Sequence, residues 1–141
     1  MSLPTHGYSG TPLIKKLGIK PGMQAAILNP PENYFAETLG PLPDGVTLHR
    51  LLQPDLDFIH FFSLRSRQLA VEFPKLKAAL AQDGMLWISW PKKAAKVPSD
   101  LDENLVRQIG LDNGLVDVKV AAVDAVWSGL KFVVRLADRK P

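Results

Sequence analysis

The segment "LWISWPKKAAKV" (86–97) ends an apolar run with residue types that can hold an anion. Trp90 closes the run, and Lys92 and Lys93 follow Pro91 directly. Ammonium groups attract an anion as point charges, and an indole face can stack against a flat ligand. The alternative is a solvated basic loop with Trp90 in the core, because most charged loops only cover the surface. Both interpretations place the lysines at the end of a strand.

Polar residues also follow two earlier apolar runs. Asn29 comes after "MQAAIL", and Ser63 and Arg65 come after "LDFIHFF". If these strands are parallel, their carboxyl ends share one edge of the sheet, which is where ligands of such sheets bind. Arg65 and Arg67 would also open a helix, whose first N–H groups and dipole favour an anion. The sequence therefore predicts an anion pocket formed by Asn29, Ser63, Arg65, Arg67, Trp90, Lys92 and Lys93.

The N-terminal segment "GYSGTPL" (7–13) is a second candidate for ligand binding. Tyr8 and Ser9 lie between two glycines, so their hydroxyls and nearby backbone donors would precede a helix. This loop would fold over the edge of the sheet and add Tyr8 and Ser9 to the pocket. Alternatively, Thr11 only caps the helix and Tyr8 anchors the terminus by packing.

The segment "WSGLK" (127–131) is a candidate partner surface. Its first three residues, "WSG", join two strand-like runs, so Trp127 would lie at the tip of a hairpin near Lys131. An exposed tryptophan at that place would mark a surface that binds a partner. Alternatively, Trp127 folds back over the sheet as a core residue.

No motif assigns a catalytic residue or a cofactor. The three histidines have no metal-ligand spacing, so no metal site is predicted, and His60 fits the buried side of a strand. Glycine-rich dinucleotide and phosphate motifs are absent, and so is the GxSxG motif of serine hydrolases. Lys92 would serve as a nucleophile only if burial beside Trp90 and the charge of Lys93 lowered its pKa.

Composition limits the classes of protein to consider. The 141 residues, 46% hydrophobic and 22% charged, predict one domain over 1–141, with a loop and short helix at 1–22. The net charge of +3 suits an anionic small molecule or an acidic protein segment as partner, and is too small to indicate a nucleic-acid binder. Because cysteine, a membrane-length apolar run and a secretion signal are absent, we expect a cytoplasmic protein without a membrane partner. The oligomeric state stays open.

Apolar runs of strand length alternate with helical segments along the chain. Strands are predicted at 23–29, 46–52, 56–64, 85–91, 116–126 and 130–136. Helices are predicted at 11–18 and 32–39, at 65–82 with a split at Pro74, and at 99–111 with a capping box from Ser99 to Asp102. Strands with two apolar faces imply a parallel sheet covered on both sides. The pattern predicts a Rossmann-like α/β domain: a small, doubly wound, mostly parallel sheet with a C-terminal antiparallel hairpin.

Two resemblances agree with this fold. The segment 56–136 resembles the second half of Rossmann-fold methyltransferases in its order of strand, helix, strand, helix and terminal hairpin. Nearly the whole chain resembles a family of small bacterial proteins of unknown function. The matching motifs are "GYSGTPLIKKLGIKPG" (7–22), "LWISWPKK" (86–93) and "GLVDVKVAAVDAVWSGLKFVVR" (114–135). This second resemblance implies the fold and carries no established activity.

The turn after the first strand departs from the methyltransferase pattern. Those enzymes hold S-adenosylmethionine over a glycine-rich turn there, whereas this chain reads "ILNPPENY" and has no glycine between Gly22 and Gly40. Pro30 and Pro31 offer no N–H donors and cannot adopt a positive φ. The second strand, "VTLHRLL", also lacks the acidic residue that would hold a ribose. The sequence therefore predicts that the methyl-donor site is closed or rebuilt.

Two functions follow from these observations. The first is a small Rossmann-like binding or regulatory protein that lacks a standard S-adenosylmethionine site and holds an anion at its basic rim. The alternative is a minimal methyltransferase-like enzyme, or another transferase, with a rebuilt ligand site.

Overall fold

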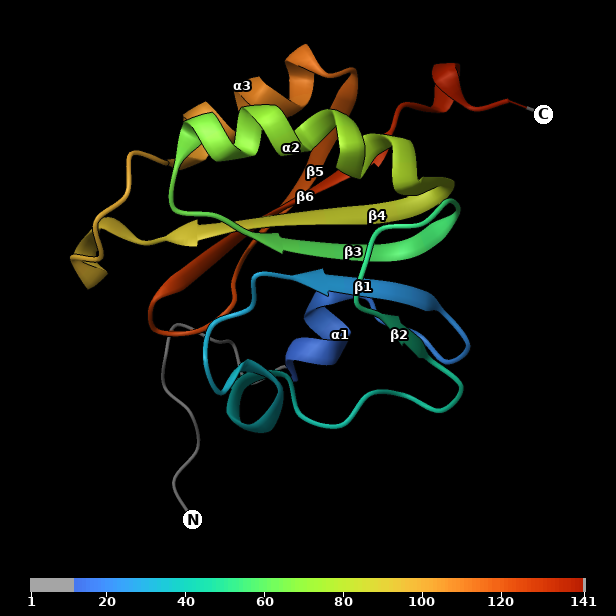
Figure 1. Cartoon of the computed structure of the whole chain (residues 1–141), viewed down its shortest axis with the longest axis horizontal. Coiled ribbons are helices and arrows are strands. Elements are labelled where there is room, and N and C mark those ends of the chain that lie inside the picture. Colours follow the sequence, from blue (N-terminus) through green and yellow to red (C-terminus); the bar gives the residue numbers. More distant parts are fainter. Residues whose placement is uncertain (1–11, 141) are drawn as a thin grey trace.

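One six-stranded sheet organises the chain in the computed structural model, which describes residues 12–140 (Figure 1). The strand order is β2-β1-β3-β4-β6-β5. The strands are β1 (Gln24–Leu28), β2 (Thr47–His49), β3 (Leu56–Phe62), β4 (Leu80–Pro91), β5 (Leu115–Ala122) and β6 (Trp127–Val134). Strands β1 to β4 pair in parallel, whereas β6 is antiparallel to both β4 and β5. This arrangement confirms the predicted α/β class with its antiparallel C-terminal hairpin.

Helical elements cover both faces of the sheet (Figure 1). On one face lie α2 (Ser66–Ala79) and α3 (Glu103–Asp112), and on the other lie α1 (Leu13–Leu17) and the π-helical turn η1 (Tyr34–Leu39). Two short 3-10 turns complete the chain, η2 (Lys93–Ala95) and η3 (Leu136–Asp138). No helix in the described part of the chain is long and apolar enough to cross a membrane.

Each face of the sheet has its own hydrophobic core because successive strand residues point to opposite sides. On β3, Ile59 and Phe61 join the core under α2 and α3, whereas Phe58 and Phe62 join the core under α1 and η1. Trp87 fastens α1 to the second face, since its indole Nε1 donates a hydrogen bond to Leu17 O at 2.9 Å. Burial on both faces explains why the strand segments read as nearly continuous apolar runs.

The prediction that Pro74 splits the third helical segment is wrong. The structure has one continuous helix, α2, with Pro74 inside it. Proline removes one backbone hydrogen bond, but Leu69, Phe73, Leu76 and Ala79 on both sides of it are buried against the sheet. Packing of this apolar stripe therefore holds the helix together across the proline.

The predicted capping box of the last helix is also wrong in part. Asp102 is the N-cap residue, and its Oδ1 accepts a hydrogen bond from Leu105 N at 2.8 Å. Ser99 Oγ instead donates to Leu64 O at 2.7 Å and so ties the loop before α3 to the end of β3. The helix begins at Glu103, because the carboxylate that satisfies its free N–H groups belongs to Asp102.

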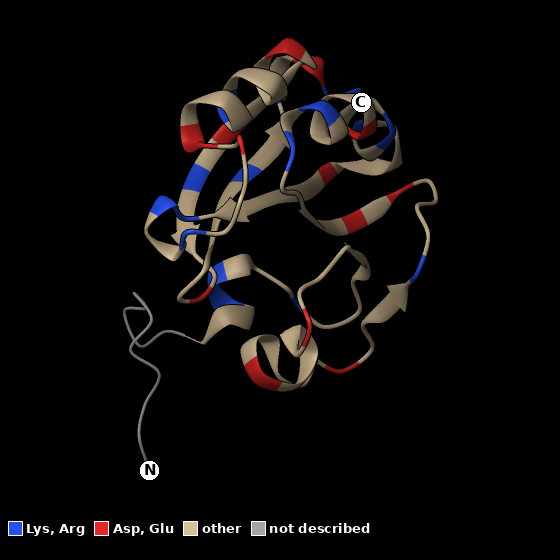
Figure 2. Cartoon of the chain, turned by 60° about the vertical axis from the view of Figure 1, so that its left-hand side comes forward, with Lys and Arg blue, Asp and Glu red and all other residues tan. Residues whose placement is uncertain are grey.

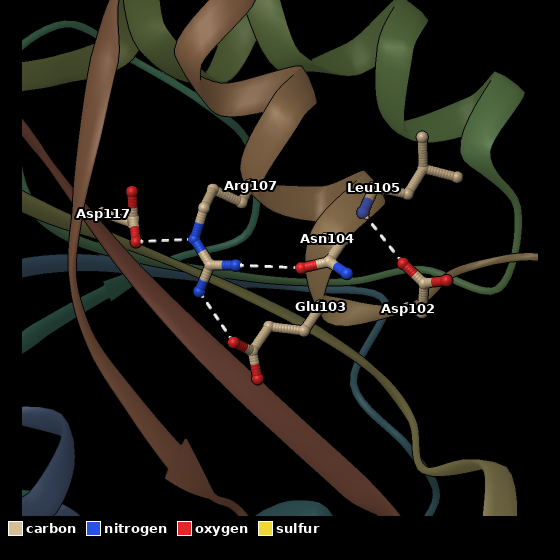
Figure 3. A network of polar contacts seen from close by, with 6 residues as sticks. All are labelled: Asp102, Glu103, Asn104, Leu105, Arg107 and Asp117. Carbon is tan, nitrogen blue, oxygen red and sulfur yellow. Dashed lines mark hydrogen bonds and ion pairs between the residues drawn. The ribbon is translucent and has the colours of Figure 1, made fainter.

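An arginine network fastens α3 to β5 (Figure 3). The guanidinium of Arg107 donates to Asp117 Oδ2 at 2.8 Å, to Glu103 Oε2 at 2.7 Å and to Asn104 Oδ1 at 3.3 Å. These hydrogen bonds to carboxylates raise the pKa of Arg107. The network therefore ties α3 to β5 of the hairpin.

The hairpin turn lies four residues earlier than the sequence indicates. Strand β5 ends at Ala122 and β6 begins at Trp127, so the "WSG" segment is part of a strand. Asp124 closes the turn, since its Oδ1 accepts hydrogen bonds from Val126 N and Trp127 N, both at 2.8 Å. Trp127 therefore starts β6 opposite Pro91 of β4 and is not the tip of a hairpin.

Candidate functional site

A pocket of about 570 Å³ lies at the carboxyl ends of β1 and β3. Parallel pairing of these strands, with Leu28 beside Phe61, brings the residues after them to one edge of the sheet. Trp127 reaches the same edge from the start of β6, which runs in the opposite direction. The residues that line the pocket are Asn29, Phe62, Leu64, Arg65, Gln68 and Trp127.

Asn29 makes the bend after β1 without a glycine. Its φ of +55° lies in the left-handed region, which asparagine tolerates better than most residues. Its Nδ2 donates a hydrogen bond to Phe62 O at 3.5 Å, so the amide links the ends of β1 and β3. Pro30 and Pro31 follow at once, and neither has an N–H that could bind a ligand. The turn is tight, but its backbone offers fewer donors than a glycine-rich turn.

Aromatic rings pack around Phe62, which lines the pocket. The side chain is 2% exposed, and its ring makes edge contacts with Trp127 and Tyr34 at centroid distances of 5.2 and 5.0 Å. The ring of His60 stacks on Phe62 with centroids 4.1 Å apart. Edge and offset contacts of this kind are the favourable arrangements of aromatic pairs. These contacts hold one wall of the pocket in place, and Trp127 is part of that wall.

His60 is the centre of a buried polar chain behind this wall. Its Nδ1 is hydrogen-bonded to Tyr34 OH at 3.1 Å and its Nε2 to Ser89 Oγ at 2.7 Å. Burial lowers the pKa of His60 from 6.5 to about 3, and burial followed by the charge of Asp124 raises the pKa of Tyr34. The imidazole is therefore neutral at physiological pH, as expected for a core histidine with both ring nitrogens bonded.

Ser63 and Arg65 lie together after β3 but play different parts. Ser63 is buried. Its hydroxyl is within donating distance of two acceptors, Gln68 Oε1 at 2.9 Å and Arg65 O at 3.2 Å. This hydroxyl shapes the loop and does not line the pocket. Arg65 is exposed and lines the pocket, where its guanidinium can form a bidentate pair of hydrogen bonds with a carboxylate or phosphate.

A carboxylate of this chain already holds the first N–H group of α2, which the sequence-based expectation of an external anion did not include. Asp100 already occupies this helix end, because its two carboxylate oxygens accept hydrogen bonds from Ser66 N at 2.7 Å and Ser66 Oγ at 2.6 Å. The same bonds lower the pKa of Asp100. Arg67 lies in a neighbouring hollow of about 470 Å³ that it shares with Arg65 and Asp100.

The cluster of Trp90, Lys92 and Lys93 does not line the pocket. Trp90 is only 5% exposed and belongs to the core under α2 and α3, on the opposite face of the sheet from Phe62. Lys92 Nζ donates to Asp124 O at 2.8 Å, so this lysine braces the hairpin turn. Lys93 begins the exposed turn η2. The expected meeting of these residues with Arg65 and Asn29 is therefore not observed.

The other candidates are also placed. Trp127 is half-buried against the core under α1 and lines the pocket, in agreement with its interpretation as a residue that folds back on the sheet. Lys131 is half-buried in the middle of β6, where burial, then Lys119 and Lys20, lower its pKa. Tyr8, Ser9 and Thr11 lie outside the described residues. Within residues 12–140, no group of three or more His, Cys, Asp or Glu side chains could hold a metal ion.

Sequence reasoning missed three lining residues. Phe62 and Leu64 flank Ser63 at the end of β3, and Gln68 lies near the start of α2. Their positions in the chain could have indicated them, because residues next to the carboxyl end of a central strand can line a ligand pocket there. Residue type hid Phe62 and Leu64, because apolar residues at the end of a strand are first interpreted as core.

Solved structures with the same architecture include methyltransferases and proteins solved with bound SAM or SAH. A SAM-dependent methyltransferase from Aquifex aeolicus has a TM-score of 0.58 and 17% identity, over 87% of this chain and 88% of that one. DhpI, solved as a complex with SAH, has a TM-score of 0.62 and 10% identity over 89% and 83% of the two chains. Fibrillarin from Aeropyrum pernix, with natively bound S-adenosyl-L-methionine, has a TM-score of 0.55 and 13% identity over 91% and 71%.

No family model and no curated protein matches the sequence. The resemblance to a bacterial family of unknown function therefore stays a prediction. At these low identities the solved structures establish the fold alone. This chain has the Rossmann-like α/β fold that those methyltransferases share.

Proposed function

We propose that this chain is a methyltransferase-like or related transferase enzyme whose ligand lies in the pocket at the carboxyl ends of β1 and β3. The observation that supports this proposal is the position of the pocket. It lies where open α/β sheets bind ligands, in a fold whose solved examples include complexes with S-adenosyl-L-methionine and SAH. Its volume of about 570 Å³ is within the range of pockets that hold small molecules.

The residues around the pocket suit an adenosyl compound in a rebuilt site. Trp127, with Phe62 packed against it, offers aromatic surface for a purine ring, and the amides of Asn29 and Gln68 offer donors and acceptors. Arg65 would bind a carboxylate of the ligand. These side chains would replace the backbone donors that Pro30 and Pro31 remove. S-adenosylmethionine, when bound, supplies a methyl group for transfer.

Ligand-induced stabilisation tests the proposal. S-adenosylmethionine and SAH are each added to the full chain, and the melting temperature and the heat of binding are measured. Binding to the native state alone stabilises it by about 2.7 kcal/mol at a ligand concentration of 100 times Kd. Arg65→Gln should weaken binding about tenfold or more, because a charge-assisted hydrogen bond is worth about 1.5–3 kcal/mol.

A matched control is Arg67→Gln, which removes the same charge from the neighbouring hollow instead of the pocket. This variant should bind like the unmodified protein. No stabilisation by either compound at millimolar concentration would contradict the proposal. Equal losses in both arginine variants would show that net charge, and not the pocket, determines binding.

A second candidate is a binding or regulatory protein that has no methyl donor. The bend at Asn29, Pro30 and Pro31 favours it, because two N–H donors are missing from the turn that follows β1. This candidate predicts that adenosyl compounds do not bind, while a small dicarboxylate stabilises the protein and loses affinity in Arg65→Gln. Titration of both ligand classes therefore separates the two functions.

A further inference from the structure

Lysines of α1, β5 and β6 and of the segments that follow α1 and β4 form a group of like charges, and Figure 2 marks the basic residues along the ribbon in blue. Lys119 of β5 and Lys131 of β6 are direct cross-strand neighbours. Lys16 belongs to α1 and Lys20 follows it, while Lys92 comes after the end of β4. We call these five residues the lysine surface.

Backbone hydrogen bonds hold three of these ammonium groups in place. Lys119 Nζ donates to Lys16 O at 3.0 Å, and Lys16 Nζ donates to Ala122 O at 3.2 Å. Lys92 Nζ donates to Asp124 O at 2.8 Å. Each acceptor is a carbonyl, so none of these bonds neutralises the charge of the lysine.

The local acidic residues do not balance these charges. Within residues 12–140, the ion pairs involve Lys75 and Arg107, and none involves Lys20, Lys92, Lys119 or Lys131. The nearby carboxylate of Asp124 accepts hydrogen bonds from two backbone N–H groups of the hairpin turn. Like charges such as those of Lys20, Lys119 and Lys131, which form no ion pair within residues 12–140, create a positive potential that attracts a multivalent anion.

Two of these lysines have a lowered pKa, for which burial is the first cause and neighbouring lysines are the next. Burial, then Lys119 and Lys92, lower the pKa of Lys16. Burial, then Lys119 and Lys20, lower the pKa of Lys131. Lys119 joins the two sets, because it is the cross-strand neighbour of Lys131 and its Nζ donates to Lys16 O. A bound anion would relieve this repulsion.

We propose that the lysine surface is a binding site for a small oligophosphate, a ligand with two or more linked phosphate groups. Ammonium groups bind phosphate oxygens as point charges, and linked phosphates can contact several of them at once. The modest net charge of +3 favours a small ligand over a nucleic acid, which needs an extended basic face. The site is separate from the pocket, because none of its lysines lines the pocket.

Calorimetric titration with inorganic tripolyphosphate, pyrophosphate and monophosphate at one ionic strength tests this proposal. We expect affinity to rise at least tenfold from monophosphate to tripolyphosphate. The double variant Lys119→Gln/Lys131→Gln should lose at least tenfold in tripolyphosphate affinity. A control is Lys75→Gln, which removes a lysine of α2 that is paired with Glu72 on the other face of the sheet, and it should bind normally.

Lys20→Gln is a second variant, since this exposed residue lies in a turn and its replacement leaves the core intact. It should also weaken tripolyphosphate binding, by a smaller factor. Equal affinity in the double variant and in Lys75→Gln would overturn the proposal. So would equal affinity for monophosphate and tripolyphosphate, or tighter binding of a single-stranded oligonucleotide than of tripolyphosphate. No adenosyl compound is used, so a failure of the proposed transferase function leaves this result unaffected.

Discussion

His60 lies between two hydroxyl groups near the centre of the sheet. A neutral imidazole has one donor and one acceptor nitrogen, and Tyr34 OH and Ser89 Oγ can each take the complementary role. The ring also stacks on Phe62, a lining residue of the pocket. The neutral ring therefore satisfies its partners and supports the pocket wall, whereas a protonated ring would be a buried charge.

The first prediction concerns the pH dependence of stability. The unfolded chain binds a proton at His60 near pH 6.5, whereas in the folded state the pKa of His60 is about 3. The unfolded state thus binds more protons, so stability is complete above pH 6.5 and is lost as the pH falls toward 3. The free energy of unfolding, measured with urea, should fall by up to about 1.4 kcal/mol per pH unit in this range.

A His60→Leu variant is the control for this prediction. It should be less stable at pH 7 by about 1–3 kcal/mol, because Tyr34 OH and Ser89 Oγ lose their common partner. Its stability should change much less than that of the unmodified protein between pH 6.5 and 5. Equal slopes in the two proteins would mean that His60 is not the group that titrates.

At the residue scale, part of the candidate site could be predicted from the sequence. Asn29 and Arg65 share one pocket because they follow neighbouring parallel strands, which the apolar runs indicate. Trp90 could not be assigned by type, since its side depends on the alternation of residues along β4 relative to β3. Lys92 does not line the pocket, because its Nζ donates a hydrogen bond to Asp124 O. The two residues are 32 positions apart, so the sequence alone does not indicate this contact.

Helix α3 packs on the sheet through a glycine. A Cβ at Gly110 would lie 2.5 Å from Phe132 Cζ and closer still to Cε1. Phe132 is fully buried and makes an edge contact with Phe73 of α2, with centroids 5.5 Å apart. The ring has little room to move, so the close approach of α3 to β6 depends on the missing side chain.

The second prediction is that Gly110→Ala destabilises the protein, although helix propensity alone predicts the opposite. Alanine would gain about 1 kcal/mol from propensity in a helix interior. Overpacking of a core costs about 1–3 kcal/mol, and here the clash is with a buried ring. The difference between these two effects is a fall in the free energy of unfolding of up to about 2 kcal/mol.

Gln108→Ala is the control, because Gln108 is an exposed residue of the same helix. Its effect should stay within about 0.5 kcal/mol. A Gly110→Ala variant that is more stable than the unmodified protein would show that α3 can shift away from Phe132. Denaturant unfolding of both variants gives the comparison.

At the element scale, long apolar runs predicted the strands well, whereas turn chemistry misled the prediction at the hairpin. Gly129 suggested a turn, but it lies within β6, where a Cβ would come within 3.0 Å of Trp87 Cε3. The actual turn is closed by the Asp124 carboxylate. Pro74 suggested a break in the helix, but α2 is continuous, because packing against the sheet outweighs the one hydrogen bond that proline removes.

The sheet gives the whole molecule two unlike surfaces. Its α2–α3 face includes the arginine network of Arg107, in which carboxylates balance the charge. Its α1 face combines the pocket wall at Phe62 and Trp127 with the lysine surface. Positive charge is therefore uneven across the molecule, although the net charge is only +3. Because salt screens repulsion between like charges, we expect the free energy of unfolding to depend on salt concentration.

The third prediction follows from this asymmetry and concerns sodium chloride. Raising its concentration from about 0.05 to about 0.5 M shortens the Debye length from roughly 14 to 4 Å, so repulsion within the lysine surface is screened. The free energy of unfolding should rise by about 0.5 kcal/mol more in the unmodified protein than in Lys119→Gln/Lys131→Gln, since exposed pairs of charges are worth up to about 1 kcal/mol. Chloride is used because it does not bridge several ammonium groups as linked phosphates would. An equal response to salt in both proteins would mean that these lysines do not repel one another in the folded state, and the charge asymmetry would then have no energetic consequence.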